Sequence, residues 1–391
     1  MGEQEQAGAD LAAIDTLLTD EERAIRARVR AWVEEAGVVE AMLGHWEAAS
    51  FPVELLPGLG RLGVAGGPLH GYGCAGWSTA GYGLALAELA RASGSLSTTV
   101  HVQSGLAMTA IRMHGSEEQR ERWLPPMSRF EAIGAFAATE PEVGSDLGAL
   151  TTTATAVPGG FSLRGEKRWI GHGTVCDAAV VLARAEDGRV NGFLVERGTP
   201  GWSAEVITGK GSQRAVWQAH ITLRDCVVPE RSRLPGIRGL GDALRVLTHS
   251  RFGVAWDAIG QARACYEAAL AHARERRQFG APLASKQLVQ QKLVGMATEL
   301  ALMEALTIHA SRLIDADAAG PALVSMLKMN NVAKARAIAA DARDLLGGNG
   351  ILLDRQVMTH MADLEGQFTY EGTHHTNMLI VGQALTGERA F

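Results

Sequence analysis

The chain has 391 residues, of which 47% are hydrophobic and 20% charged, the composition of an ordinary globular protein with room for two or three domains. A formal net charge of −6 and a pI near 6.1 give no electrostatic reason to expect nucleic acid or an anionic membrane as a partner. The indication of function must therefore come from local motifs.

The four cysteines are widely spaced and form no CxxC pair, so the sequence predicts neither a disulfide framework nor a zinc site. Isolated thiols suit a reducing compartment. Residues 1–30 are acidic and then amphipathic, without a long apolar run, which predicts neither a signal peptide nor a membrane span. We therefore expect a cytoplasmic protein.

Residues 1–134 alternate helical patterns with breaks rich in Gly and Pro, which predicts a helical domain. The run 81–115 has apolar residues at helical spacing and a break around Ser93–Ser95. The segment "GSEEQRERWLPPM" predicts a short helix with an N-terminal cap that Pro125 and Pro126 stop.

From residue 135 the pattern changes to short β-branched runs separated by turns that contain Gly, Pro or Asp. The runs cover residues 151–173, 178–198 and 219–229. They predict an antiparallel β domain over residues 135–235, an ordinary size for one domain.

Long helical patterns return over residues 236–391. Two of them open with a proline, Pro282 and Pro321, and we expect each proline in the first turn of its helix. Long helices joined by short loops indicate a bundle.

Two motifs of this last region each allow two interpretations. "LGGNG" (346–350) is either a glycine C-cap or a backbone that approaches a cofactor closely. It is not a dinucleotide fingerprint, because the GxGxxG spacing is absent and no strand precedes it. "RERRQFG" (274–280) is either a solvated helix end or a phosphate clamp, since guanidinium groups match pyrophosphate oxygens.

Two motifs around the β region are equally open. "TEPEVGSD" (139–146) is either a turn or a lining of small hydroxyls for a planar ligand. Trp169, in "EKRWIGHG", is either a core residue or the wall of a cofactor site. Each motif is weak by itself, and their order along the chain is far more specific.

The histidines do not predict a metal site. His374 and His375 are adjacent, so they do not share a helix face, and no acidic or Cys partner lies at ligand spacing. His101 is a lone histidine in an apolar segment, structural by default but able to line a pocket. We expect no bound metal.

The stretch "FTYEGTHHTNMLIVGQALTG" (368–387) places Glu371 between an aromatic residue and a Gly-Thr pair, just before an apolar helix. Burial disfavours a charged carboxylate, so an acid at this position needs a reason. One interpretation is an acid that caps the following helix.

In order along the chain, "FAATEPEVGSD", "EKRWIGHG", "SRFGVAWDAIG", "RERRQFGAPLASKQLVQQKL", "ARDLLGGNG" and "YEGTHH" resemble the signature blocks of the acyl-CoA dehydrogenases. The resemblance runs from about residue 15 to the end. Within the family, "GYGCAG", "VQSGL", "GSEEQR" and "ALTGERAF" are most similar to the glutaryl-CoA dehydrogenase branch.

The resemblance implies an α+β fold with an N-terminal helical domain (1–134), a middle antiparallel β domain (135–235) and a C-terminal four-helix bundle (236–391). It also implies a homotetramer, built as a dimer of dimers. The implied cofactor is FAD, placed between the β domain and the C-terminal bundle and reaching a neighbouring subunit. The implied partners are an acyl-CoA substrate and an electron-transfer flavoprotein as acceptor.

The same resemblance assigns residues to the site. The positions that contact the flavin in the family match Phe136, Ala138, Thr139, Gly144, Ser145, Trp169 and Gly171. Those around the pyrophosphate and adenine match Arg276, Gln278, Phe279, Gly347 and Gly348, and further cofactor contacts match Thr373 and His375. The substrate-binding positions match Arg251, Tyr370, Ser97 and His101.

Glu371 matches the catalytic base of the family. The α-hydrogen of a thioester is a poor acid, and burial of a carboxylate raises its pKa toward neutrality, which makes it a stronger base. The β-hydrogen leaves as hydride to the flavin, and the product is a trans-2-enoyl thioester.

Two positions depart from the family pattern. Glutaryl-specific enzymes carry an arginine that binds the distal carboxylate and a glutamate seven residues before it, and these positions are Ser97 and Ala90 here. A buried carboxylate without its charge partner costs about 3–5 kcal/mol, so we expect a short or medium uncharged acyl chain and no decarboxylation of glutaryl-CoA.

The second departure is Gly171, where the family usually has a Thr whose hydroxyl donates a hydrogen bond near the flavin. Loss of this donor predicts a less reactive flavin, or room for a water or an unusual substrate group. If the missing hydroxyl matters, Thr at this position should speed flavin reduction.

The sequence leaves three alternatives. The acyl group could be tethered to a carrier protein, as in some relatives of secondary metabolism, instead of serving catabolism of fatty or amino acids as a CoA ester. The reduced flavin could react with oxygen. The chain could also be a flavin- or acyl-CoA-binding scaffold that has lost catalysis, although Glu371 and Arg251 are both present.

Overall fold

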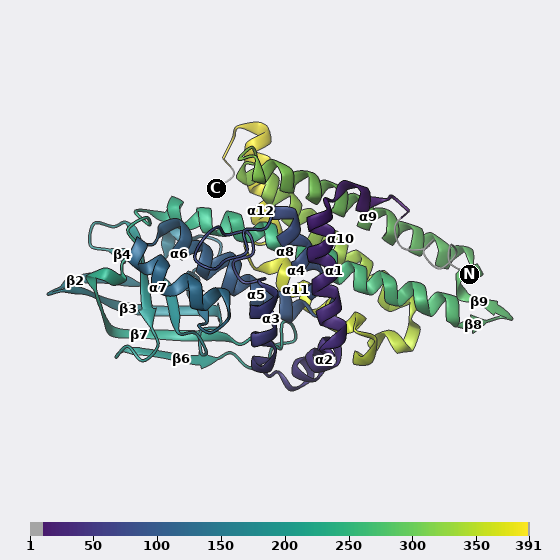
Figure 1. Ribbon diagram of the computed structural model, residues 1–391, viewed down its shortest axis with the longest axis horizontal. Helices are drawn as coiled ribbons and strands as arrows, with labels where there is room; N and C mark the ends of the chain where they lie inside the picture. Colours follow the sequence, from purple (N-terminus) through teal and green to yellow (C-terminus); the bar gives the residue numbers. More distant parts are fainter. Residues whose placement is uncertain (1–10, 390–391) are drawn as a thin grey trace. The chain divides into compact units, whose positions relative to one another are not determined.

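The computed structural model describes residues 11–389 of the chain (Figure 1). The start of the acidic N-terminal stretch and the last two residues of the "ALTGERAF" block therefore lie outside the described residues. The chain divides into two compact units, each assembled from separate segments. The first unit takes residues up to 44, 78–97 and 254 onward, and the second takes residues 45–77 and 98–253.

The first unit is helical. Its elements are η1 (Ile14–Leu17), α1 (Asp20–Glu35), most of α2 (Val38–Ala48), α4 (Thr79–Ala92), the larger part of α8 (Leu240–Glu275), α9 (Gln287–Asp315), α10 (Pro321–Leu345), α11 (Val357–Thr369) and α12 (His374–Thr386). Short elements join them: the β8 (Arg277–Gln278) and β9 (Ala281–Pro282) hairpin, η6 (Leu283–Ser285), η7 (Gly347–Ile351) and η8 (Leu353–Arg355). Helix α10 lies against α9, α11 and α12 (Figure 1).

Helix α1 is fixed by a capping box. Thr19 accepts a hydrogen bond from the backbone N–H of Glu22, and the Glu22 carboxylate accepts one from Thr19 N–H. The same carboxylate pairs with Arg312 of α9 at 2.6 Å and accepts from Ser78 at 2.8 Å. One acid therefore ties the start of α1 to α9 and to the residue that precedes α4.

Two proline predictions were wrong. Helix α9 begins at Gln287, because Pro282 belongs to strand β9 and residues 283–285 form η6. Helix α7 (Glu117–Ser128) contains Pro125 and Pro126 instead of ending at them. Both prolines lie in the last turn of the helix. Each lacks a backbone N–H, so the helix loses hydrogen bonds only at its C-terminal end. The predicted N-terminal cap of α7 is confirmed, with Ser116 and Gln119 forming a capping box.

The second unit combines short helices with a sheet. Its helices are η2 (Val53–Leu55), α3 (Leu56–Leu62), the end of α5 (Gly94–Val100), η3 (His101–Met108), α6 (Thr109–His114), α7, η4 (Leu147–Ala149), η5 (Glu230–Ser232) and the start of α8. The predicted break at Ser93–Ser95 is confirmed, since α4 ends at Ala92 and α5 starts at Gly94. Segment η3 is a π-helix, which the sequence pattern did not predict.

The sheet has seven strands: β1 (Gly134–Ala137), β2 (Thr153–Val157), β3 (Gly160–Gly171), β4 (Ala178–Ala185), β5 (Val190–Glu196), β6 (Trp202–Val206) and β7 (Gln218–Pro229). They run in the order β1-β4-β2-β3-β7-β6, with β5 on β4. Most pairs are antiparallel, as expected, but β1 and β2 both pair with β4 in parallel. Strand β4 is central and apolar, so its order of neighbours could not be read from alternation.

Gln103 of η3 joins the helices of this unit to its sheet. Its amide donates to the carbonyls of Met127 at 2.9 Å and Ala132 at 2.8 Å. Its oxygen accepts from Gly134 N–H, the first residue of β1, at 2.7 Å. The side chain is fully buried, so these three bonds fix β1 and the segment after it.

Candidate functional site

The predicted flavin-contacting segment begins where β1 ends. Phe136 is buried in the strand, and Ala138 and Thr139 follow it. Gly144 and Ser145 come after a turn closed by Glu140 N–H donating to Val143 C=O at 2.9 Å, and both are exposed. The second unit therefore presents these residues in one continuous loop.

Glu140 holds this loop, and the sequence motif did not single it out. Its buried carboxylate accepts from Thr151 N–H and hydroxyl, both at 2.7 Å, and from Thr152 N–H at 2.9 Å. Lys167 of β3, also fully buried, donates to Glu140 at 2.9 Å and to Ala138 C=O at 3.1 Å.

The ionisation of this pair follows from its surroundings. Burial opposes the charged form of Glu140, but hydrogen bonds from Thr152 and the positive charge of Lys167 outweigh it and lower the pKa of Glu140 to about 2. Burial lowers the pKa of Lys167 to about 8 against the attraction of Glu140. Both groups are predominantly charged at neutral pH.

Trp169 lies on a bulge of β3. The register of β3 against β7 shifts between Lys167 and Ile170, and Trp169 has a left-handed φ of 64°. Arg168 N–H donates to Thr139 C=O at 2.9 Å, so the bulge lies directly beside the loop after β1. The indole is 52% exposed, which excludes the core-residue interpretation. Residues other than glycine that are held in a left-handed backbone conformation cluster at functional sites.

Gly171 is packed against η3. A Cβ built on Gly171 would lie 2.7 Å from Cγ2 of Val102, closer than side chains tolerate. Its φ is not positive, so the glycine is required by this neighbour and not by the backbone conformation. Val102 is a second residue that the sequence did not indicate.

The residues predicted to contact substrate in the second unit lie close together. His101 opens the π-helix η3, and its Nε2 is 2.7 Å from the hydroxyl of Ser250, next to Arg251 in the chain. Burial lowers the pKa of His101 to about 4, so the imidazole is neutral at pH 7. Arg251 is buried. π-helical segments occur frequently at functional sites.

Glu371 lies in the first unit, on the loop between α11 and α12. It is half-buried and has a left-handed φ of 55°, followed by Gly372 at 80°. The buried Lys328 of α10 donates to Gly372 C=O at 2.7 Å, and Asn377 of α12 donates to the same carbonyl at 2.9 Å. The loop is therefore held from two sides.

Glu371 is not the helix cap. Thr373 caps α12, because its hydroxyl accepts from Thr376 N–H at 3.1 Å. His375 is exposed at the start of that helix, and Tyr370 precedes Glu371 and is half-buried. Among residues 11–389, no group of three or more His, Cys, Asp and Glu side chains could hold a metal ion.

The predicted pyrophosphate-side residues are exposed at two ends of the first unit's helices. Arg276 follows α8, and Gln278 and Phe279 form the β8–β9 hairpin, with Phe279 96% exposed at a φ of 50°. Gly347 lies just after the C-cap residue of α10, Leu346, and has a left-handed φ of 59°. Within the described chain, a Cβ at Gly347 or Gly348 would meet no atom within 4 Å, so this backbone is open to a ligand.

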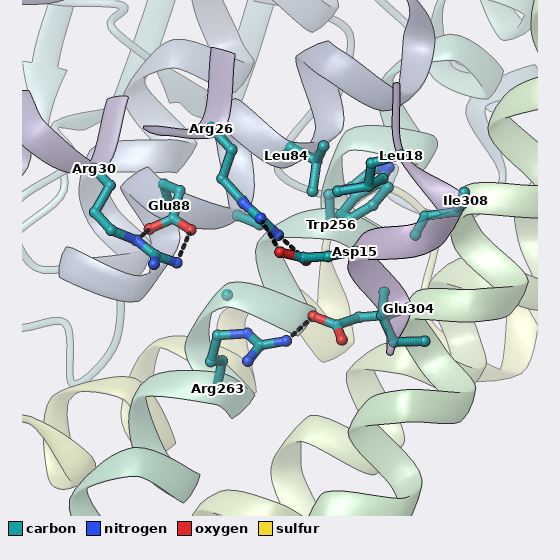
Figure 2. Close-up of a pocket in the computed structure, with 13 residues that line it drawn as sticks. Asp15, Leu18, Arg26, Arg30, Leu84, Glu88, Trp256, Arg263, Glu304 and Ile308 are labelled. Atoms are coloured by element: carbon teal, nitrogen blue, oxygen red, sulfur yellow. Dashed lines mark hydrogen bonds and ion pairs between the residues drawn. The ribbon is translucent and has the colours of Figure 1, made fainter. Parts of the chain in front are cut away.

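The first unit also contains a cavity of about 140 Å³ bounded by η1, α1, α4, α8 and α9. Figure 2 shows that each arginine around it faces an acid: Arg26 with Asp15, Arg30 with Glu88, and Arg263 with Glu304. None of the predicted site residues lines this cavity. Because its charges are paired, it has the character of a structural ion-pair network.

The chain matches three family models: "Acyl-CoA dehydrogenase, N-terminal domain" over residues 19–131, "middle domain" over 135–226 and "C-terminal domain" over 238–386. It is 32% identical to benzylmalonyl-CoA dehydrogenase of Aromatoleum aromaticum, over 95% of this chain and 100% of that one.

Two solved structures are close in fold. Glutaryl-CoA dehydrogenase from Mycobacterium smegmatis has a TM-score of 0.96 and 43% identity, covering 98% of this chain and 99% of that one. A glutaryl-CoA dehydrogenase of the same organism in complex with FADH2 also has a TM-score of 0.96, with 40% identity and the same coverage. The chain belongs to the acyl-CoA dehydrogenase family.

Proposed function

We propose that this protein is an FAD-dependent dehydrogenase that converts an acyl-CoA to its trans-2-enoyl-CoA, with Glu371 as the base that removes the α-proton. The observation that carries this proposal is the Glu371 loop, where Lys328 and Asn377 hold the carbonyl that follows a half-buried carboxylate. We keep 1–134, 135–235 and 236–391 as the proposed domain boundaries.

The residues of each unit fit FAD. In the second unit, the exposed Trp169 offers an aromatic face beside Thr139, as a planar ring system requires. In the first unit, Arg276 is exposed and the backbone at Gly347 and Gly348 is open, as a diphosphate requires. When bound, FAD supplies the acceptor for the β-hydrogen.

The remaining chemistry belongs to the protein. Glu371 takes the α-proton, and its left-handed backbone, fixed at Gly372, sets the direction of the carboxylate. Hydrogen bonds to the thioester carbonyl would stabilise the developing enolate. We assign substrate contacts to Arg251, Tyr370, Ser97 and the neutral His101.

The proposed substrate is a short or medium uncharged acyl chain. Ser97 and Ala90 are both buried and neutral, so a distal carboxylate would find no charge partner at either position. This supports an uncharged chain over glutaryl-CoA, and dehydrogenation without release of CO2.

We also propose a homotetramer, an electron-transfer flavoprotein as acceptor and a cytoplasmic location. Exposed apolar side chains in the first unit support a further copy of the chain as partner: Phe279 (96% exposed), Leu288 (77%), Val294 (64%) and Leu302 (61%). Of the described helices, α9 alone is long and apolar enough to cross a membrane, and 44% of its most apolar window is buried. Cys74, Cys176, Cys226 and Cys265 are free thiols, which suits a reducing compartment.

The test is an absorbance spectrum of the purified protein followed by anaerobic titration with butyryl-, isobutyryl-, hexanoyl- and glutaryl-CoA. We expect a bound flavin that an uncharged ester bleaches. A yellow protein that no CoA ester bleaches would contradict the proposal and favour a carrier-tethered substrate. Release of CO2 from glutaryl-CoA at the rate of its dehydrogenation would contradict the assignment of the acyl class.

A further inference from the structure

A group of buried polar side chains gathers around Gly94 at the start of α5. Asp257 and Gln261 lie four residues apart on α8 and so share a face, and Ser97 lies next to Asp257. A Cβ built on Gly94 would lie 2.6 Å from Oε1 of Gln261 and 3.1 Å from Cβ of Asp363 on α11. We call Ser97, Asp257 and Gln261 the α8 polar cluster.

The cluster has unmet hydrogen-bonding capacity. Both carboxyl oxygens of Asp257 and both amide atoms of Gln261 are buried without a hydrogen-bond partner in the described part of the chain. The Ser97 hydroxyl, although adjacent to Asp257, donates to Gly94 C=O at 3.2 Å. Native proteins rarely leave so many buried polar atoms unpaired, and each such atom has a cost.

The cluster is also uncharged. Burial raises the pKa of Asp257 well above its usual range, and only the nearby Ser97 hydroxyl opposes this shift. Unlike the acids of the cavity in Figure 2, Asp257 has no cation facing it among residues 11–389. Asp257 is therefore protonated at neutral pH, and the side chains of the cluster offer both hydrogen-bond donors and acceptors.

The cluster lies near the Glu371 loop. Lys328 of α10 contacts Gly372, and Asn331, three residues further along α10, donates to Ala255 C=O of α8 at 3.3 Å. Three residues of an α-helix rise about 4.5 Å. One turn of α10 therefore supports both the loop of the proposed base and the segment of α8 that leads into Asp257.

We propose that Asp257, Gln261 and Ser97 bind the distal end of the acyl substrate, and that this end carries an uncharged group that both donates and accepts hydrogen bonds, a hydroxyl or a carboxamide. This inference rests on the proposed function. An apolar chain would leave the buried polar atoms unpaired, and an anionic end would meet no cation at Asp257. A neutral polar end satisfies them without desolvating a charge.

The test uses three CoA esters of equal length that differ in the terminal atom: hexanoyl, 5-hydroxypentanoyl and 5-aminopentanoyl. We expect kcat/KM for flavin reduction by the hydroxy ester to exceed that of the hexanoyl ester by about tenfold or more. An equal or higher value for hexanoyl would overturn the inference while leaving the dehydrogenase intact, and so would a preference for the cationic amino ester. Failure of all three, and of the simple acyl esters, would instead overturn the proposed function and this substrate role with it.

Substitutions of Asp257 distinguish a role in substrate binding from a purely structural role. Asp257→Leu should lower the ratio of kcat/KM for the hydroxy ester to that for hexanoyl-CoA to about one, whereas Asp257→Asn, which keeps a donor and an acceptor, should retain the preference. Cys265→Ala, a buried position two turns further along α8, is the matched control and should leave this ratio unchanged. Because Asp257→Leu removes an unpaired buried group, its Tm should not fall. If both Asp257 variants lower the Tm and neither alters the preference, Asp257 is structural and the inference fails.

Discussion

Val102 occupies the space that a side chain at position 171 would need. A Cβ on Gly171 would lie 2.7 Å from Cγ2 of Val102, and a β-branched Val has little freedom to move aside. The two residues therefore form a matched pair within the second unit. The effect of a Thr hydroxyl at position 171 on the flavin can therefore be measured only when Val102 is replaced as well.

Gly171→Thr alone should not speed flavin reduction, contrary to what the sequence suggested. Overpacking against Val102 should cost about 1–3 kcal/mol and displace η3 or β3. The double variant Gly171→Thr with Val102→Ala should recover the lost stability. If the hydroxyl matters to the flavin, it should also reduce faster than wild type.

Stopped-flow reduction and thermal unfolding of both single variants and the double variant measure this coupling. Val102→Ala alone is the control for the cavity it opens. Additive effects of the two substitutions would contradict the pairing.

Glu371→Gln should abolish bleaching by any acyl ester while leaving the flavin bound. Removal of a general base costs about 10²–10⁴ in rate, and the amide keeps the shape of the side chain. The measurement is the flavin spectrum before and after anaerobic addition of substrate. Loss of flavin from the variant would show that Glu371 supports the cofactor as well as the reaction.

Lys328→Met should slow flavin reduction about 10- to 100-fold without loss of flavin, because Gly372 C=O would lose its donor from α10 and the Glu371 loop would shift. Asn377 would still donate to this carbonyl, so the loss of one hydrogen bond should cost about 0.5–1.5 kcal/mol of stability. Lys334→Met is a matched control on the same helix, where the ammonium pairs with Glu299 in a half-exposed position. Equal effects of the two variants on reduction would contradict a specific role for Lys328.

Glu140→Gln should destabilise the protein at pH 7 by about 3–5 kcal/mol, since it leaves the buried Lys167 ammonium without its carboxylate. The pKa of Glu140 in the folded protein, about 2, lies below its ordinary value of 4.5. Its contribution is therefore fully present above pH 4.5 and disappears as the pH falls through about 2.

Denaturant unfolding from pH 7 down to pH 3 measures this effect. The difference between wild type and Glu140→Gln should narrow over the acid part of the range. The double variant Glu140→Gln with Lys167→Met should recover part of the loss at pH 7, because no buried charge remains unpaired. A difference independent of pH would mean that the carboxylate's charge is not what stabilises the loop.

Local features were predictable because a few neighbouring residues create them. The cap of α7 at Ser116 and the break before α5 each depend on contacts within a few residues. Predictions of helix ends from proline were wrong where the neighbouring structure determined the fold of the segment. Pro282 joined a hairpin instead of opening α9, and α7 continued through two prolines.

The sequence by itself determined the family, the order of helical and β regions and the position of the proposed base, because ordered motifs and hydrophobic periodicity are written along the chain. Only the tertiary structure decided which distant residues meet. Glu140 with Lys167, Gly171 with Val102, and Ser97 with Asp257 are pairs whose members lie far apart in the chain. Whether a buried polar group is paired depends on what the fold brings to it, and no local pattern encodes that partner.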